Sequence, residues 1–250
     1  MSNNYFKFKQ FTIWQDKCAM KVCTDACLFG AAVAQHPAAD TDHSTNDVNL
    51  RDTIHCLDIG TGTGILSLMF AQKNSTAKID AVEINTDAAE QARQNITASP
   101  WANRIQIFNE DILKFNPRKQ YDYIISNPPF FEDDLQSPDN AKNNAKHDTT
   151  LNLIQLLNFV DAHLSKEGYF AVLLPYHRVN YFMEEATKTG FYLNCQTLIK
   201  HTMKHRFFRG KLVISRNQKE PHRSEIVIKD LEQNYTAEFS AALKDYYLFL

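Results

Sequence analysis

The stretch that decides the fold runs from Cys56 to Ile65 and reads CLDIGTGTGI. An apolar run that ends in closely spaced glycines is typical of a strand that turns sharply into a helix, because glycine permits tight turns and close approach of a ligand. A dinucleotide-binding loop has the pattern G-x-G-x-x-G, whereas Gly60, Gly62 and Gly64 follow G-x-G-x-G. Asp58 stands just before them, and its carboxylate would repel a pyrophosphate but could hold an ammonium group.

Strand and helix patterns alternate around this loop, which predicts an α/β fold with a mostly parallel sheet and helices on both faces. We expect strands at 54–59, 78–84, 105–108, 121–126 and 168–174, and helices at 24–34, 65–72, 87–99, 151–164, 180–187 and 236–247. Strand patterns at 192–199, 211–215 and 225–228 follow one another without a strong helix among them. They predict antiparallel pairing at the C-terminal end of the sheet.

Length and composition indicate one domain, 1–250, with an N-terminal extension at 1–50 and a polar loop insertion at 36–52. No run reaches the roughly 18 apolar residues of a membrane span, and the first residues lack the apolar core of a signal peptide. We therefore expect a cytoplasmic protein that needs no membrane. The five cysteines form no CxxC pair, so we expect reduced thiols rather than a metal cluster.

Acidic residues follow the expected strands and suggest what the glycine loop binds. Glu83 ends the second strand, where a carboxylate can accept both ribose hydroxyls. Asp111 follows the third strand and could accept a hydrogen bond from an adenine amine, with Ile112 packing on the ring. An amino acid, a ribose, an adenine and no phosphate describe S-adenosylmethionine, whose positive charges Asp58 and the other two acids would complement.

The four residues Asn127, Pro128, Pro129 and Phe130 follow the strand at 121–126 and must turn away from the sheet, because proline lacks a ladder donor and has a fixed φ. The Asn127 amide and the Pro128 carbonyl would be two rigid acceptors beside an aromatic face, which suits a planar NH2 group. We also expect the polar loop that follows, 131–147, to order when a substrate binds.

The chain resembles a known family of enzymes. The segment Lys21 to Ala31 (KVCTDACLFGA) resembles the one that precedes the cofactor loop in bacterial tRNA(Val) adenine-N6 methyltransferases, and the similarity extends through 127–130 to 234–239 and 244–248. It implies a class I, Rossmann-like S-adenosylmethionine-dependent methyltransferase fold. It further implies methyl transfer to N6 of adenosine 37, next to the anticodon of tRNA-Val, and a cofactor role for Thr24 and Asp25. His201 and His205 lie four residues apart but have no third ligand at metal-site spacing, so we expect no metal ion. We also expect a monomer.

A basic segment favours an RNA substrate. Eight Lys and Arg residues lie between 200 and 223, opposed by one acid, Glu220. This segment is either a phosphate-binding face or a solvated surface. The candidate RNA-binding residues are Lys200, Lys204, Arg206, Arg209 and Lys211.

Other functions remain open from the sequence alone. A turn built around two acceptors also suits the amide of a protein glutamine, or adenine in DNA or another RNA. A non-catalytic cofactor-binding scaffold and a nicotinamide-dependent dehydrogenase are further alternatives; the glycine spacing and Asp58 disfavour the dehydrogenase.

Overall fold

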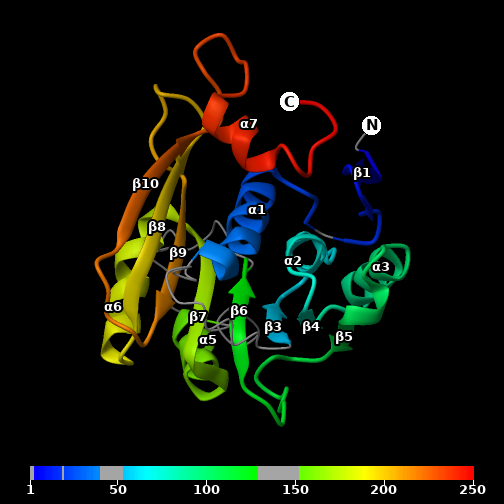
Figure 1. Cartoon of the computed structure of the whole chain (residues 1–250), viewed down its shortest axis with the longest axis vertical. Helices are drawn as coiled ribbons and strands as arrows, with labels where there is room; N and C mark the ends of the chain where they lie inside the picture. Colours follow the sequence, from blue (N-terminus) through cyan, green and yellow to red (C-terminus); the bar gives the residue numbers. More distant parts are fainter. Residues whose placement is uncertain (1–2, 19, 40–52, 129–151) are drawn as a thin grey trace, which may run out of the picture.

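The computed structural model describes residues 3–18, 20–39, 53–128 and 152–250, and the side chains of all of these except 36–39. The described residues form an eight-stranded sheet and a two-stranded one (Figure 1). In the large sheet the order is β10 (His222–Val227), β8 (Tyr192–Lys200), β9 (Arg209–Ser215), β7 (Leu164–Pro175), β6 (Tyr121–Ser126), β3 (Ile54–Ile59), β4 (Ala77–Glu83) and β5 (Ile105–Asn109). The small antiparallel sheet pairs β1 (Tyr5–Lys7) with β2 (Thr12–Trp14). The predicted α/β class with a mostly parallel sheet is confirmed.

Helices cover both faces of the large sheet (Figure 1). One face packs against α1 (Thr24–Ala39), α2 (Ile65–Lys73), α3 (Thr86–Thr97) and α7 (Ala237–Leu243), and the other against α5 (Leu153–His163) and α6 (Val179–Lys188). Two short 3-10 helices, η1 (Ala102–Arg104) and η3 (Tyr176–Arg178), lie in connections. Alternate strand residues separate the two cores, because side chains alternate across a strand: Cys56 and Ile125 belong to the first core, Leu57 and Ile124 to the second.

Strand direction defines two edges of the sheet. In the described sheet every strand except β9 runs the same way. We call the edge where these strands end the carboxyl edge, and the opposite one the amino edge. Because β9 runs backwards, it starts at the carboxyl edge with Arg209, opposite Pro175 at the end of β7. Ligands of open α/β sheets bind at the carboxyl edge.

The C-terminal strands differ in part from the prediction. Antiparallel pairing holds for β9 with both β7 and β8, but β10 is parallel to β8, so that part of the prediction is wrong. The reason is strand order. Both sides of β9 are occupied, so β10 joins the sheet outside β8; it runs back from the amino edge, which makes it parallel to that neighbour.

The last helix is also shorter than the predicted 236–247. Thr236 caps α7 through a hydrogen bond from Phe239 N, and the helix ends at Leu243. The next residues form one closing turn, in which Tyr246 N and Tyr247 N both donate to the Leu243 carbonyl. Tyr247 can then pair with Phe8 of the N-terminal extension. The polar loop predicted at 131–147 lies outside the described residues, as does most of 36–52.

Candidate functional site

The glycine loop connects β3 to α2 at the carboxyl edge. Gly60, Gly62 and Gly64 have φ of +70°, +56° and +83°, a left-handed region in which side chains with a Cβ are strained. A Cβ added at Gly60 or Gly62 would meet no described heavy atom within 4 Å. Backbone conformation therefore requires these two glycines, and the space beside the loop is open to a ligand.

Asp58 lies under this loop and is fully buried. Its Oδ2 accepts hydrogen bonds from Thr61 Oγ1 at 2.6 Å and from Ser67 Oγ at 2.7 Å, so it holds the loop to the first turn of α2. Its Oδ1 is buried without a hydrogen-bond partner among the described residues. Burial raises the pKa of this carboxyl from 3.8 to about 6, because the charged form loses its hydration.

Glu83 ends β4 beside the loop and is 9% exposed. Its Oε2 accepts from Gly62 N and its Oε1 from Asn85 N, each at 2.9 Å. Each carboxylate oxygen has a further lone pair, so both could still accept a ribose hydroxyl.

Ile84 is a candidate that the sequence analysis did not single out. It follows Glu83 directly and is 63% exposed, although it is a large apolar residue. Asn109 Nδ2 donates to the backbone oxygens of Glu83 and Ile84 and fixes this turn at the end of the strand. An exposed isoleucine held at the carboxyl edge suits contact with the face of a ring. The signal in the sequence is weak, because one apolar residue after an acid has no distinctive spacing.

Asp111 and Ile112 follow β5 on the same edge. Asp111 is half-buried, and its Oδ1 accepts from Leu113 N at 3.0 Å, which forms a local turn. Ile112 is buried in the second core with Leu57 and Val82, so most of its side chain packs inside the protein. We expected Ile112 to pack on an adenine. Only the small part of its side chain that the core leaves exposed could do so.

The turn after β6 lies next to the glycine loop. Ile59 of β3 pairs with Ser126 of β6, and Ser126 Oγ donates to the Ile59 carbonyl at 2.9 Å. The next residues of the two strands are Gly60 and Asn127, so strand pairing brings the loop and the turn together. Asn127 is half-buried and Pro128 is buried. Pro129 and Phe130 lie outside the described residues.

Thr24 and Asp25 form the start of α1, and Asp25 makes an ion pair that the sequence did not suggest. Asp25 Oδ2 accepts from Arg209 Nε at 2.8 Å, with only 11% of the Asp25 side chain exposed. This contact joins a residue expected to serve the cofactor to one expected to bind RNA. Their charges neutralise each other in the structure.

The N-terminal extension is bound to the glycine loop through Asn95 of α3, another residue that the sequence analysis missed. Asn95 is buried; its Oδ1 accepts from Trp14 N, and its Nδ2 donates to the carbonyls of Trp14 and Thr63. Gln91, one turn earlier, accepts from Lys17 N. Two amides on a predicted helix are ordinary residues in the sequence, so only the fold identifies their partners.

The candidate RNA-binding residues have different surroundings. Lys200 pairs with Glu225 at 3.2 Å and Arg209 with Asp25, whereas Lys204 and Arg206 are exposed. Lys211 is half-buried in β9.

The described residues contain no group of three or more His, Cys, Asp or Glu side chains that could hold a metal ion. None of their helices has the length and apolar character needed to cross a membrane.

Solved methyltransferases share this architecture. A predicted O-methyltransferase from Agrobacterium tumefaciens superposes with a TM-score of 0.62, covering 88% of this chain and 96% of its own at 13% identity. A glycopeptide N-methyltransferase in complex with S-adenosylmethionine gives a TM-score of 0.51, covering 74% of this chain and 93% of its own, also at 13% identity. A family model described as the methyltransferase small domain matches residues 40–152. This chain has the class I methyltransferase fold, as predicted.

Relatives in sequence define the family more narrowly. A tRNA1(Val) (adenine(37)-N6)-methyltransferase of Klebsiella pneumoniae is 38% identical over all of this chain and 97% of its own length. One of Dyadobacter fermentans is 42% identical over 83% of this chain and 80% of its own. This chain belongs to the tRNA1(Val) (adenine(37)-N6)-methyltransferase family, and the predicted resemblance is confirmed.

Proposed function

We propose that this chain transfers a methyl group from S-adenosylmethionine to N6 of adenosine 37 in tRNA-Val. The observation that carries the proposal is a turn with two acceptors, Asn127 and Pro128, placed beside the glycine loop by the pairing of Ile59 with Ser126, in a chain whose relatives carry this activity in their names.

The residues of the carboxyl edge fit the cofactor. Asp58 Oδ1 is a buried acceptor without a described donor, Glu83 has free lone pairs, and the space beside Gly60 and Gly62 is open. When bound, the cofactor supplies an electrophilic methyl group on a sulfonium centre. We propose that Asp58 acts on its amino-acid end, Glu83 on the ribose and Asp111 on the adenine amine, with Ile84 against the ring and Thr24 and Asp25 at the N-terminal side.

The turn at Asn127 would orient the exocyclic amine of the substrate for methyl transfer. The lone pair of an exocyclic amine is delocalised into the ring, so the amine is a weak nucleophile. Asn127 Oδ1 and the Pro128 carbonyl would accept its two N–H groups and direct the lone pair towards the methyl carbon. As positive charge develops on the nitrogen, two fixed acceptors stabilise the transition state more than the ground state. We propose that Pro129 and Phe130 complete the turn, with Phe130 stacking on the base.

The reaction is tested directly with bulk unmodified tRNA. The enzyme and labelled S-adenosylmethionine are incubated with the RNA, which is then digested to nucleosides. We expect N6-methyladenosine in the product, mapped to position 37 of tRNA-Val. A labelled nucleoside of any other kind would refute the proposal.

We further propose that the enzyme acts as a monomer in the cytoplasm, without a metal ion, and that residues 1–250 form one domain with the extension 1–50 and the insertion 36–52. The bonds of Asn95 to both the extension and the glycine loop support a single folding unit. Light scattering that gave the mass of a dimer would contradict the monomer.

A further inference from the structure

We propose that the loop from His201 to Phe208, between β8 and β9, is the tRNA-docking surface of this enzyme, and that basic residues 216–223 take no part in it. This inference rests on the proposed function and deepens it. It concerns where the RNA backbone lies on the protein.

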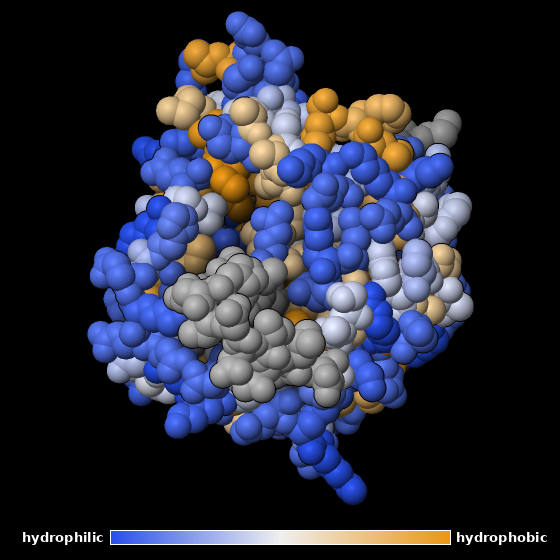
Figure 2. Space-filling view, viewed as in Figure 1, coloured by the Kyte–Doolittle hydropathy of each residue, from blue (hydrophilic) through white to orange (hydrophobic). Residues whose placement is uncertain are grey.

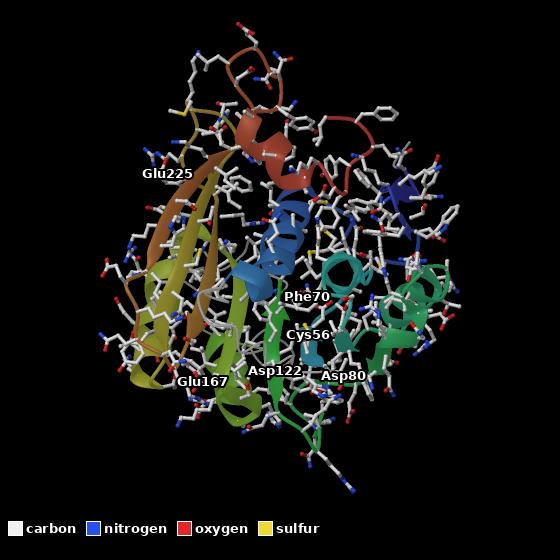
Figure 3. The ribbon with its side chains drawn as sticks, in the orientation of Figure 1. Cys56, Phe70, Asp80, Asp122, Glu167 and Glu225 are labelled. Atoms are coloured by element: carbon white, nitrogen blue, oxygen red, sulfur yellow. The ribbon has the colours of Figure 1, made fainter. Side chains whose placement is uncertain are left out.

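The structure divides the basic segment between the two edges of the sheet. The connection from β8 to β9 lies at the carboxyl edge, where β7 and β6 also end. The connection from β9 to β10, which carries Arg216 and Lys219, lies at the amino edge. Figure 3 shows the contrast: Glu225, the partner of Lys200, lies towards the upper end of the sheet, and Glu167, the partner of Asn217, lies at the lower end. Of these two connections, only the one that contains 201–208 lies at the same edge as Asn127.

Ion pairs neutralise some cations of the basic segment and leave others available to bind phosphate. Lys200 and Arg209, at the two ends of the loop, are paired with Glu225 and Asp25. Lys204 and Arg206, within the loop, are exposed and form no ion pair with a described residue. The loop therefore presents two cations that can approach phosphate without losing an internal partner. The neighbouring connection after β10, residues 228–235, carries Lys229 against Asp230 and Glu232, so it adds no net positive charge beside the loop.

Rings support the loop and apolar groups lie exposed near it. His201 stacks on Phe208 with ring centroids 4.0 Å apart, and Phe207 lies 5.5 Å from Tyr176 of η3. Met203 in the loop is 64% exposed and Tyr176 is 44% exposed. In Figure 2, apolar residues reach the surface at the top of the view, the end at which the β8–β9 connection lies in Figure 1. Cations beside exposed rings and apolar groups suit single-stranded RNA, which offers phosphates and unstacked bases together.

The test compares two variants with the same change of charge. K204E/R206E alters the docking loop, and K219E/R223E alters the amino edge as a matched control. Binding of an unmodified tRNA-Val transcript is measured by fluorescence anisotropy, without cofactor, over a series of salt concentrations. We expect K204E/R206E to bind at least about tenfold more weakly, and its plot of log Kd against log salt to lose about two units of slope, one for each lost phosphate contact. The control should match the wild type.

Each outcome decides the proposal. Equal weakening in both variants would show an effect of net charge and would overturn it, as would normal binding by K204E/R206E or weakening in the control alone. S-adenosylmethionine binding, measured by calorimetry, should be the same in all three proteins and shows that the variants are folded. A wild type that binds the transcript but does not methylate it would refute the proposed reaction while leaving the docking surface intact.

Discussion

The carboxylates at the carboxyl edge differ in how their oxygens are occupied. Glu83 uses both oxygens to accept backbone N–H groups, and Asp111 uses one in a local turn. Asp58 alone of these three is fully buried with an oxygen that has no described partner. A buried acceptor without a donor is costly, by roughly 1–3 kcal/mol. A bound cation near Asp58 would relieve that cost, so in its proposed role this residue would stabilise the bound cofactor and be stabilised by it.

Asn127 is expected to act mainly on the transition state. Replacing it by Ala removes one acceptor, and we expect kcat for tRNA methylation to fall about 100-fold or more, by analogy with the loss of one oxyanion-hole donor. S-adenosylmethionine affinity, measured by calorimetry, should change far less than kcat. Asn127→Asp keeps an acceptor oxygen and should retain more activity than Asn127→Ala. Equal losses in the two variants would contradict this role.

Asp58 should make stability depend on pH. Its pKa is raised from 3.8 to about 6 by burial, so between these values the folded protein holds a proton that the unfolded chain has released. Stability through this group therefore falls as pH rises from about 4 to 6. Asp58→Asn cannot ionise. The free energy of unfolding of the wild type minus that of the variant should fall by up to about 3 kcal/mol across this range. Urea denaturation of both proteins at several pH values measures it, and a difference independent of pH would refute the argument.

At the scale of elements, α3 positions the N-terminal extension. Asn95→Ala would leave Trp14 N, the Trp14 carbonyl and the Thr63 carbonyl without their partner, so we expect a loss of about 1–3 kcal/mol in stability. The lost hydrogen bond to Thr63, which lies in the glycine loop, should also affect cofactor binding. The KM for S-adenosylmethionine should rise more than kcat falls, because the variant loosens the glycine loop and leaves the turn at Asn127 in place.

Gln94→Ala is the matched control for this helix. Gln94 is the neighbouring amide on α3, but its side chain is exposed and, among the described residues, bonds only to Glu90 of the same helix. Its replacement should change stability by less than about 0.5 kcal/mol and leave KM unchanged. Urea unfolding and steady-state kinetics of both variants provide the measurements. An Asn95→Ala protein with normal KM would show that the bond to Thr63 has no effect on the site.

Local patterns in the sequence predicted the bounds of strands and helices better than they predicted which strands pair. The strand 54–59 was predicted to the residue, because an apolar run ending in glycine is a local signal. The pairing of β10 with β8 was not, since strand order depends on which edges other strands leave free. The same holds for the site. Asp58 and Glu83 could be identified from the sequence because each lies at the end of a predicted strand. The Asp25–Arg209 pair joins residues 184 positions apart, so only the fold reveals it.

At the scale of the whole molecule, the two ends of the described chain meet over α2. Tyr246 is fully buried; its hydroxyl donates to the Met69 carbonyl, and its own carbonyl accepts from Lys9 N. Asp245 pairs with Lys73 at the end of α2. Tyr247 contacts the rings of Phe6 and Phe8. The segment after α7 thus fastens the N-terminal extension to the helix that starts at the glycine loop.

This closure predicts that one C-terminal side chain stabilises both ends of the protein. Tyr246→Ala removes a fully buried ring and should cost about 3–5 kcal/mol in unfolding free energy. Phe249→Ala is the control: Phe249 is 87% exposed, and its loss should cost less than about 0.5 kcal/mol. Hydrogen exchange tests whether the N-terminal extension and residues 244–247 are coupled. In Tyr246→Ala the amides of β1 and β2 should lose protection together with those of residues 244–247, because the extension packs on that segment. Loss of protection confined to 244–247 would show that the extension is held by α3 alone.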